Sequence, residues 1–252
     1  MATRAPQIAA ELAPTSRKLP GLSIILPCFN EEANVAQAIA ESLEAGQRFS
    51  ERFEAIVVDD GSTDATATIA GGITTADRAV RLVVHPFNRG YGAALRSGIQ
   101  AAEMPWVLLT DADLQFDLAD LEEFLPLTDG NDLLVGHRIR RSDPLGRRAA
   151  AAGWNFLVRQ TFDLPVHDVD CAFKLVRRDL LEHVELVSSG AMISTELIAR
   201  CLKSGAHLQE LGVHHRPRTA GEQSGTNPRV VVRAFRELFE LRHALRPTLH
   251  AS

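Results

Sequence analysis

The sequence has no apolar run of about eighteen residues, the length that a membrane-spanning helix needs, so we predict no transmembrane helix. Residues 1–20 contain no continuous apolar core of the kind found in secretory signals, and we expect them to form a mobile leader. Cysteine is scarce, since Cys28, Cys171 and Cys201 are the only three, lie far apart and lack metal-ligand spacing. We therefore expect reduced thiols in a cytoplasmic protein.

An excess of positive charge is also missing. The 27 Lys and Arg residues are outnumbered by 32 Asp and Glu residues, and the net charge of −5 gives no reason to expect a nucleic-acid partner. Internal repeats and low-complexity tracts are absent as well. The remaining composition, 45% hydrophobic and 23% charged over 252 residues, is typical of a globular chain that can bury a sizeable core.

Short apolar runs alternate with segments of helical periodicity along the first half of the chain. The runs expected to form strands cover residues 22–29, 53–60, 80–86, 106–110 and 132–138. This alternation predicts an α/β fold with a mixed, mostly parallel sheet that is flanked by helices. We place a single domain at residues 21–226, followed by an amphipathic helix and tail over residues 227–252.

Polar residues gather where the first four predicted strands end. They are Pro27, Asn30 and Glu31 after the first strand, Asp59 and Asp60 after the second, Asn88, Arg89 and Gly90 after the third, and Asp111, Asp113 and Gln115 after the fourth. Any one group alone is typical of a capping turn, and Asn30 would suit the start of a helix. In an open parallel sheet, however, ligands bind beyond the carboxyl ends of the strands. Four such groups at equivalent positions therefore favour a ligand site.

Asp111 and Asp113 are separated by one residue in the stretch LLTDADLQF, residues 108–116. Carboxylates suit a hard divalent cation, Mn²⁺ or Mg²⁺, and such ions commonly bind one or two carboxylates together with substrate phosphates. The two aspartates need not share one role. We expect one to bind the metal and the other to contact the sugar or ribose of a nucleotide.

Four segments, ILPCFNEEANV, IVVDDGSTDAT, HPFNRGYGAALRSGI and VLLTDADLQF, follow one another in this order. Together they resemble the family-2 GT-A glycosyltransferases, and in particular the branch of dolichyl- or polyprenyl-phosphate mannose (or glucose) synthases. The resemblance covers about residues 21 to 225, and DADLQ is its most telling part because that branch carries this glutamine beside the metal. VGHR, LGRR, DVDCAFKLVRR and QELGVHHRPRTAGEQS are similar to later motifs of the branch. The Q-x-x-R-W motif of processive polysaccharide synthases is missing, which argues against that function.

The resemblance implies a GT-A, Rossmann-like fold and a metal-dependent, inverting transfer of a hexose, mannose or glucose, from a GDP- or UDP-sugar to a polyprenyl or dolichyl phosphate. It assigns the metal and the donor diphosphate to Asp111, Asp113 and Gln115. It assigns the nucleoside to Pro27, Asn30, Glu31, Asp59 and Asp60, with Asn88 and Gly90 on the other side of the pocket. It assigns the acceptor phosphate to Arg138 with Arg147 or Arg148, and gives Arg218 a further contact to the donor phosphates.

General chemistry is consistent with these roles. Breaking a sugar–phosphate bond releases a nucleoside diphosphate with developing negative charge, which a divalent cation and an arginine stabilise. A phosphate acceptor is already anionic near neutral pH, so it needs no dedicated general base, and the sequence offers no histidine–carboxylate pair beside the acidic motif. We assign Asp168 and Asp170 to shaping the acceptor side, and surface roles to His214 and His215.

Residues 228–246 read as a basic amphipathic helix. Its predicted apolar stripe consists of Val231, Phe235, Leu238 and Leu245, and its five arginines less two glutamates leave a local charge of +3. Such a helix either docks on its own domain or a partner subunit, or lies in a membrane interface, and both readings stay open. The second reading would make the protein peripheral on the cytoplasmic face of the membrane.

Three functions therefore stand side by side. The first is transfer of a hexose to a polyprenyl phosphate. The second is the same chemistry on a soluble acceptor, a small molecule or a sugar, which the missing membrane helices favour. The third is a non-catalytic nucleotide-binding module, which the acidic and arginine clusters disfavour because binding alone needs no metal geometry.

Overall fold

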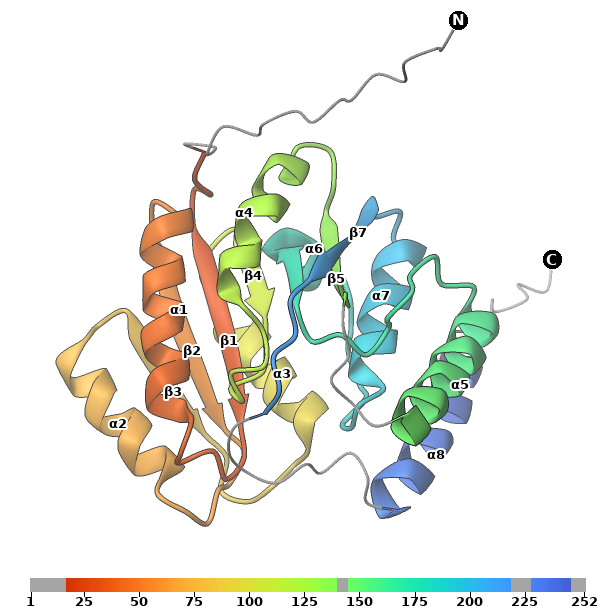
Figure 1. Ribbon diagram of the computed structural model, residues 1–252, viewed down its shortest axis with the longest axis horizontal. Coiled ribbons are helices and arrows are strands. Elements are labelled where there is room, and N and C mark those ends of the chain that lie inside the picture. The colour runs from red at the N-terminus through yellow and green to blue at the C-terminus, as the bar shows by residue number, and fades with distance from the viewer. Residues whose placement is uncertain (1–16, 140–144, 219–227, 246–252) are drawn as a thin grey trace, which may run out of the picture.

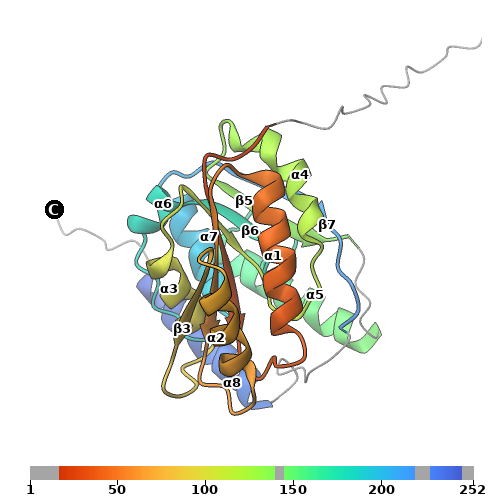
Figure 2. The same ribbon diagram turned by 90° about the vertical axis from the view of Figure 1, so that its left-hand side faces the viewer.

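The computed structural model describes residues 17–139, 145–218 and 228–245, the side chains of 145–150 and 228–232 excepted. One seven-stranded sheet forms the centre, with helices on both of its faces (Figure 1 and Figure 2). The strands are β1 (Leu22–Cys28), β2 (Phe53–Asp59), β3 (Val80–Val84), β4 (Trp106–Leu109), β5 (Leu133–Arg138), β6 (Lys174–Arg177) and β7 (Leu208–Val213). The helices are α1 (Val35–Phe49), α2 (Thr66–Ala76), α3 (Tyr91–Ala101), α4 (Leu121–Phe124), α5 (Leu145–Phe162), α6 (Arg178–Glu182), α7 (Ile193–Lys203) and α8 (Pro228–Ala244), with 3-10 turns η1 (Leu118–Asp120) and η2 (Leu125–Thr128).

The strand order in the sheet is β3-β2-β1-β4-β6-β5-β7. Neighbouring strands run parallel except at β6, which is antiparallel to both β4 and β5. Strand β2 pairs with β1, and β3 pairs with β2, on one side of the sheet. Strand β4 then pairs with β1 on its other side. The strand order therefore reverses between β1 and β4, where open α/β sheets bind their ligands. The predicted mixed, mostly parallel α/β sheet is confirmed.

The core has two halves because successive side chains of a strand point to opposite faces of the sheet. On β1, Ile24 and Leu26 belong to the half beneath α1, α2 and α4, whereas Ile25 belongs to the half beneath α3 and α7. Helix α3 approaches the sheet closely, since a Cβ on Gly98 would lie 2.4 Å from Ile25 Cγ2. Packing on both faces fixes the ends of β1 and β4, and with them the loops that carry the polar residues.

Helix α8 docks on its own domain. Leu238 and Leu241 are each 3% exposed and join the core half that α3 and α7 cover. Phe235 meets Trp154 of α5 edge to face, with 5.2 Å between the ring centroids, but it remains 42% exposed. The buried side is therefore centred on Leu238 and Leu241 and not on the predicted stripe through Phe235. The side chain of Val231 lies outside the described residues.

Two local expectations need correction. Asn30 does not cap a helix, because α1 begins at Val35; instead Asn30 has a φ of 56° and its Oδ1 accepts a hydrogen bond from Thr63 N at 2.8 Å. Residues 1–16 of the expected leader lie outside the described residues, but Leu19 is 2% exposed and its amide donates to Phe49 O at 2.8 Å. Among the described residues, no helix is both long and apolar enough to cross a bilayer.

Candidate active site

The loop after β4 carries the acidic pair at the carboxyl edge of the sheet. Asp113 is 8% exposed, and its Oδ1 accepts a hydrogen bond from the Gln115 amide at 3.2 Å. Asp111 Oδ1 accepts a hydrogen bond from the Tyr91 hydroxyl of α3 at 3.0 Å. Leu114 adopts a left-handed φ of 63°, a costly conformation for a residue with a side chain. The backbone therefore turns sharply directly after Asp113.

Arg218, in the segment that follows β7, contacts this loop. Its Nη1 lies 3.4 Å from Asp113 Oδ2, and its Nη2 forms an ion pair with Glu31 Oε1. Polar contacts hold the segment in place, since Arg216 N donates to Gln115 O at 2.7 Å and Gln115 Nε2 donates to Arg216 O at 3.0 Å. One arginine thus joins the polar groups that follow β1 and β4.

Negative charge accumulates around the acidic pair. Burial and then the neighbouring Asp111 carboxylate raise the pKa of Asp113 to about 7. Burial raises the pKa of Asp111 too, although the hydrogen bond from Tyr91 opposes this. No group of three carboxylate, imidazole or thiol ligands that would hold a metal ion occurs in the described part of the chain. Two carboxylates are the kind of ligand set that a divalent cation such as Mg²⁺ supplements with substrate phosphates.

The end of β2 adds a buried carboxylate with unused bonding capacity. Asp59 is 1% exposed, and its Oδ2 lies 3.3 Å from Ser62 N. Within the described ranges, its Oδ1 is buried and has no hydrogen-bond partner. Such an atom costs about 1–3 kcal/mol unless a donor reaches it. An N–H group of a ligand would satisfy it.

Asp60 supports the loop after β3. His85 Nδ1 lies 2.6 Å from its Oδ1, which also accepts a hydrogen bond from Arg89 N at 2.9 Å. Its Oδ2 accepts a hydrogen bond from Gly90 N at 2.7 Å. Gly90 has a φ of 100°, which a residue with a Cβ adopts only under strain. The buried carboxylate thus fixes the turn that carries Asn88 and Gly90.

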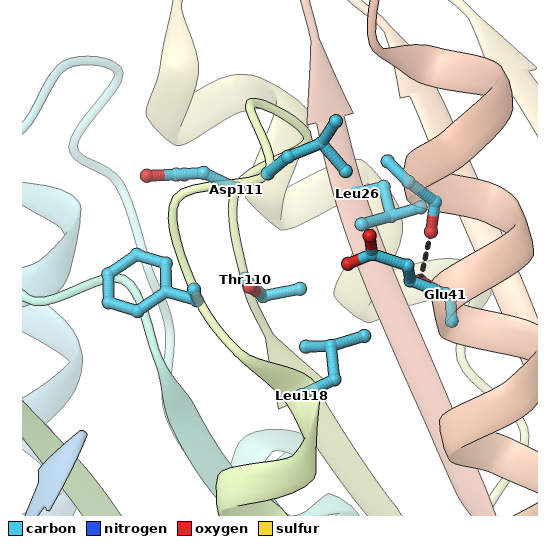
Figure 3. Close-up of a pocket in the computed structure, with 9 residues that line it drawn as sticks. Leu26, Glu41, Thr110, Asp111 and Leu118 are labelled. Atoms are coloured by element: carbon cyan, nitrogen blue, oxygen red, sulfur yellow. Dashed lines mark hydrogen bonds between the residues drawn. The ribbon is translucent and has the colours of Figure 1, made fainter. Parts of the chain in front are cut away.

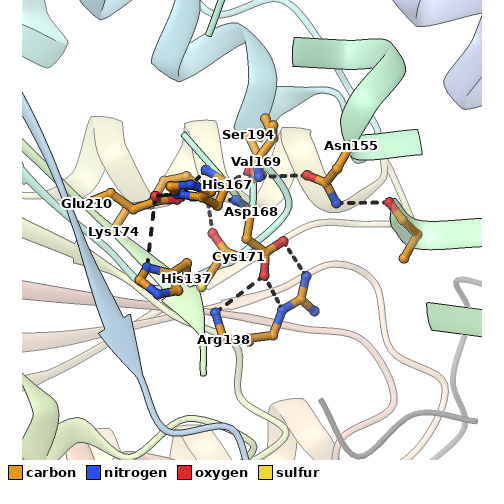
Figure 4. Close-up of polar contacts among 11 residues, drawn as sticks. His137, Arg138, Asn155, His167, Asp168, Val169, Cys171, Lys174, Ser194 and Glu210 are labelled. Carbon is orange, nitrogen blue, oxygen red and sulfur yellow. Dashed lines mark hydrogen bonds and ion pairs between the residues drawn. The ribbon is translucent and has the colours of Figure 1, made fainter. Parts of the chain in front are cut away.

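Arg138, at the end of β5, is held by Asp168 (Figure 4). Its Nε and Nη2 donate to the two carboxylate oxygens at 2.6 and 2.7 Å, a geometry that fixes the plane of the guanidinium. The two side chains are only 14% and 11% exposed. Arg147 and Arg148 fall in the first turn of α5, where side chains lie outside the described residues.

The turn that carries Asp168 is anchored by three other elements (Figure 4). Glu210 of β7 accepts a hydrogen bond from Asp168 N at 3.2 Å, and Asn155 of α5 accepts one from Val169 N at 2.9 Å. Lys174 of β6 is 1% exposed and donates to a backbone oxygen of the same turn. Burial lowers the pKa of this lysine. The orientation of Arg138 therefore depends on the packed interior and not on a surface ion pair.

A small pocket lies behind the acidic loop, next to α1 and β1 (Figure 3). Leu26, Glu41, Thr110 and Leu118 line it. The Asp111 carboxylate points away from Glu41, towards the opposite side of the loop. Asp111 itself lines the pocket, which therefore adjoins the acidic loop on the side of α1.

Most predicted site residues lie at one edge of the sheet. The residues joined by direct contacts are Glu31, Asp113, Gln115 and Arg218, and Asp111 is bound by Tyr91. Those on the adjoining strand ends and loops are Pro27, Asn30, Asp59, Asp60, Asn88 and Gly90. Three further residues belong to the site although the sequence had not singled them out. Tyr91 is the only tyrosine of the chain and follows Gly90, Phe29 is 45% exposed beside Asn30, and Lys174 begins β6 within the otherwise apolar run of residues 171–176.

Comparison with known proteins points to one family. The sequence model of "Glycosyl transferase family 2" matches residues 23–185. An uncharacterized glycosyltransferase of Mycobacterium tuberculosis is 34% identical over 205 residues, which cover 80% of this chain and 88% of the relative. The dodecaprenyl-phosphate galacturonate synthase of Rhizobium johnstonii is 30% identical over 234 residues, which cover 90% of this chain and 69% of that enzyme.

Solved structures agree on the fold. Glucosyl-3-phosphoglycerate synthase from Mycobacterium tuberculosis, in complex with UDP, superposes with a TM-score of 0.66 at 19% identity and covers 90% of this chain and 81% of its own. A second structure of that enzyme contains Mn²⁺, UDP and glucosyl-3-phosphoglycerate, with a TM-score of 0.58 at 20% identity over 90% and 77% of the two chains. The likeness supports a GT-A fold for this chain, as the sequence predicted.

We expect Asp113→Asn to stabilise the metal-free protein at pH 8. The folded-state pKa of about 7 lies above the ordinary aspartate value of ~3.9, so the folded protein binds more protons between these values. The free energy of unfolding contributed by this group therefore falls as the pH rises through that window. Asparagine removes the buried charge, so the melting temperature at pH 8 should rise, as differential scanning fluorimetry with a chelator will measure.

The same substitution should abolish the stabilisation that Mn²⁺ gives together with a nucleoside diphosphate. Glu41→Gln removes a carboxylate from the pocket on the other side of the loop and serves as the control. It should leave both the pH profile and the Mn²⁺ response unchanged. A lower melting temperature of the metal-free Asp113→Asn protein at pH 8 would contradict the electrostatic account.

Proposed function

The chain belongs to glycosyltransferase family 2, and we propose that it transfers a hexose, mannose or glucose, from a GDP- or UDP-sugar to a polyprenyl phosphate. The observation that carries the proposal is the acidic pair, whose buried Asp113 contacts Arg218, together with the oriented Arg138. The acidic pair with Arg218 suits a donor diphosphate and its cation, and Arg138 suits an acceptor phosphate. The relative from Rhizobium johnstonii, named for a polyprenyl-phosphate product, supports the choice of acceptor.

The donor diphosphate would lie against the acidic loop. Asp111 and Asp113 would hold Mn²⁺ or Mg²⁺, with Gln115 beside them, and the bound cation would offset the charge that develops on the leaving nucleoside diphosphate. Arg218 would give up its ion pair with Glu31 for the donor phosphates, because a bidentate contact to phosphate suits the guanidinium better. The manganese in the solved glucosyl-3-phosphoglycerate synthase supports this choice of cation.

The nucleoside would occupy the ends of β1 and β2. Asp59 Oδ1, buried and without a partner among the described residues, would accept an N–H of the base. Uracil and guanine both offer such a ring N–H, so this contact fits a UDP- or a GDP-sugar. Pro27 and Asn30 would line one side, and the turn with Asn88 and Gly90 would line the other. Asp60 would act indirectly, through the backbone of that turn.

The acceptor phosphate would bind Arg138 together with Arg147 or Arg148. One phosphate oxygen attacks C1 of the sugar on the face opposite the leaving diphosphate. A new C1–O bond forms while the bond to the donor phosphate breaks, and the configuration at C1 inverts. Because the attacking oxygen is already anionic, no proton has to be removed by a general base. Asp168 contributes by holding the plane of the Arg138 guanidinium.

We also propose that the protein works as a peripheral protein at the membrane surface that holds its acceptor. Helices α5 and α8 lie side by side (Figure 1). They expose Phe156, Leu157, Phe235 and Phe239 by 65%, 39%, 42% and 63%. Arg236 of α8 is 72% exposed and pairs with Glu240, and Arg242 adds a positive charge in the last turn of the same helix. An apolar surface with basic neighbours suits the interface of an anionic bilayer.

The acceptor is tested by nucleotide release from a panel of UDP- and GDP-hexoses with Mn²⁺. We expect release to require both the cation and a short-chain polyprenyl phosphate. Arg138→Lys should raise the KM for the lipid phosphate by about tenfold, because lysine lacks the fork that Asp168 orients. The KM for the donor should stay unchanged. Arg177→Lys, at an exposed arginine paired with Asp132 and Asp179, is the matched control.

Other outcomes of this panel decide between the three functions. Release with 3-phosphoglycerate or a sugar hydroxyl, and none with the lipid phosphate, would replace the proposed acceptor with a soluble one. Binding of nucleotide sugars without release under any condition would leave only a nucleotide-binding module.

We expect Phe239→Glu to weaken binding to vesicles that contain an anionic phospholipid. Transfer of one phenylalanine side chain from water contributes ~1.5–3 kcal/mol, so the partition constant should fall by about tenfold or more. Val84→Glu introduces the same charge at a valine of β3 that is 55% exposed, and it should leave binding unchanged. Co-sedimentation measures the effect. Equal binding of wild type and Phe239→Glu would contradict the assignment of this surface.

A further inference from the structure

The segment of residues 187–190 lies between α8 and the first turn of α3. Ser189 O accepts a hydrogen bond from Gly92 N at 3.0 Å. A Cβ on Gly90 would lie 2.4 Å from the same oxygen, so the two backbones are in direct contact. Gly90 N in turn donates to Asp60 Oδ2 at 2.7 Å. The segment therefore contacts the turn after β3 at Gly90, the residue whose amide is bound by Asp60.

Two charged residues of α8 hold this segment from its far side. Arg233 Nη2 donates to Ser189 Oγ at 2.5 Å, and Arg233 Nε donates to Glu237 Oε1 at 2.9 Å. Glu237 is 6% exposed and packs against Gly190, where a Cβ would lie 2.7 Å from Glu237 Oε2. The guanidinium also covers Gly90, since a Cβ there would lie 3.1 Å from Arg233 Nη2. A continuous chain of contacts therefore links α8 to Gly90.

The Arg233–Glu237 pair differs from an ordinary surface pair on the same helix. Arg236 and Glu240 have the same spacing and lie 3.4 Å apart, but their side chains are 72% and 65% exposed. Glu237 is buried instead, and its Oε2 has no hydrogen-bond partner among the residues described. The Arg233 side chain is 39% exposed, so only the carboxylate of this pair is buried. An ion pair with a buried and partly unsatisfied carboxylate adds little to stability, because desolvation offsets the attraction. Its contribution is then to fix the geometry of the groups around it.

We propose that Arg233 and Glu237 are positioning residues for the nucleotide-binding pocket. Through Ser189 they fix the backbone of Gly90, and with it the turn that closes one side of the nucleoside site. The proposal rests on the proposed function for the identity of the ligand, a nucleoside diphosphate. The contact between α8 and the turn after β3 does not depend on which ligand binds. Arg96 and Glu196 also bind the backbone of this segment, at Ser188 and at Val187 and Ser188. Without the pair, Ser189 would lose its side-chain hydrogen bond to α8, and the turn after β3 would sample conformations that do not fit the ligand.

Hydrogen exchange tests the contact without any ligand. In Arg233→Gln, the amides of residues 89–92 should exchange about tenfold faster than in the wild type, the effect of losing one charge-assisted hydrogen bond in the network. Arg233→Lys keeps a donor for Ser189 and should restore part of the protection. Glu240→Gln, in the exposed pair one turn away, should leave these amides unchanged. Unchanged exchange in a folded Arg233→Gln protein would overturn the proposal.

Calorimetry with UDP or GDP and Mn²⁺ tests the consequence for the ligand. The Kd should rise by about tenfold in Arg233→Gln and Glu237→Gln, with no change in Glu240→Gln. In turnover, the KM for the donor should rise while kcat at saturating donor stays the same. An equal loss in the Glu240→Gln control would show a general loosening of α8 and would overturn the positioning role. A wild type that binds neither nucleotide would refute the proposed function. The hydrogen-exchange result would still test whether Arg233 holds the turn after β3, because it needs no ligand.

Discussion

The repulsion between two like charges at the end of β4, one of them buried, is the constraint on which the rest of the site depends. Asp111 and Asp113 lie where the strand order of the sheet reverses, and packing on both faces prevents the strand ends from moving apart. Burial raises the pKa of Asp113 to about 7, so the charged pair is unfavourable in the protein alone. A bound cation would offset the repulsion between the two carboxylates. Part of the free energy of binding therefore comes from this edge of the sheet.

The positive charges around the acidic pair are held in two different ways. Arg218 belongs to a segment that pairs with the acidic loop, and it already bridges Asp113 and Glu31. Arg138 is oriented by Asp168, whose turn is anchored by β6, β7 and α5. An arginine whose plane is fixed beforehand loses less entropy when it binds a phosphate. The arrangement suits two phosphate groups that have to meet across one sugar.

Local signals predicted the strands and the residues at their ends. The strands β1, β2 and β4 are mostly apolar because both of their faces are buried, with Ser23 and Glu54 hydrogen-bonded to each other inside. Polar residues follow where burial stops. Contacts between distant residues could not be predicted in this way. Asp168 and Arg138 are 30 residues apart, and Ser189 and Arg233 are 44 residues apart. Asn30 was misread because a hydrogen bond from another loop overrides its capping preference.

The central claim is that the acidic pair is an incomplete site which a divalent cation and a nucleoside diphosphate complete together. Calorimetric titration of UDP or GDP, with and without Mn²⁺, measures this coupling directly. The account predicts that each ligand increases the affinity for the other by the same factor, as linkage requires. Nucleotide binding of equal strength without any divalent cation would contradict it.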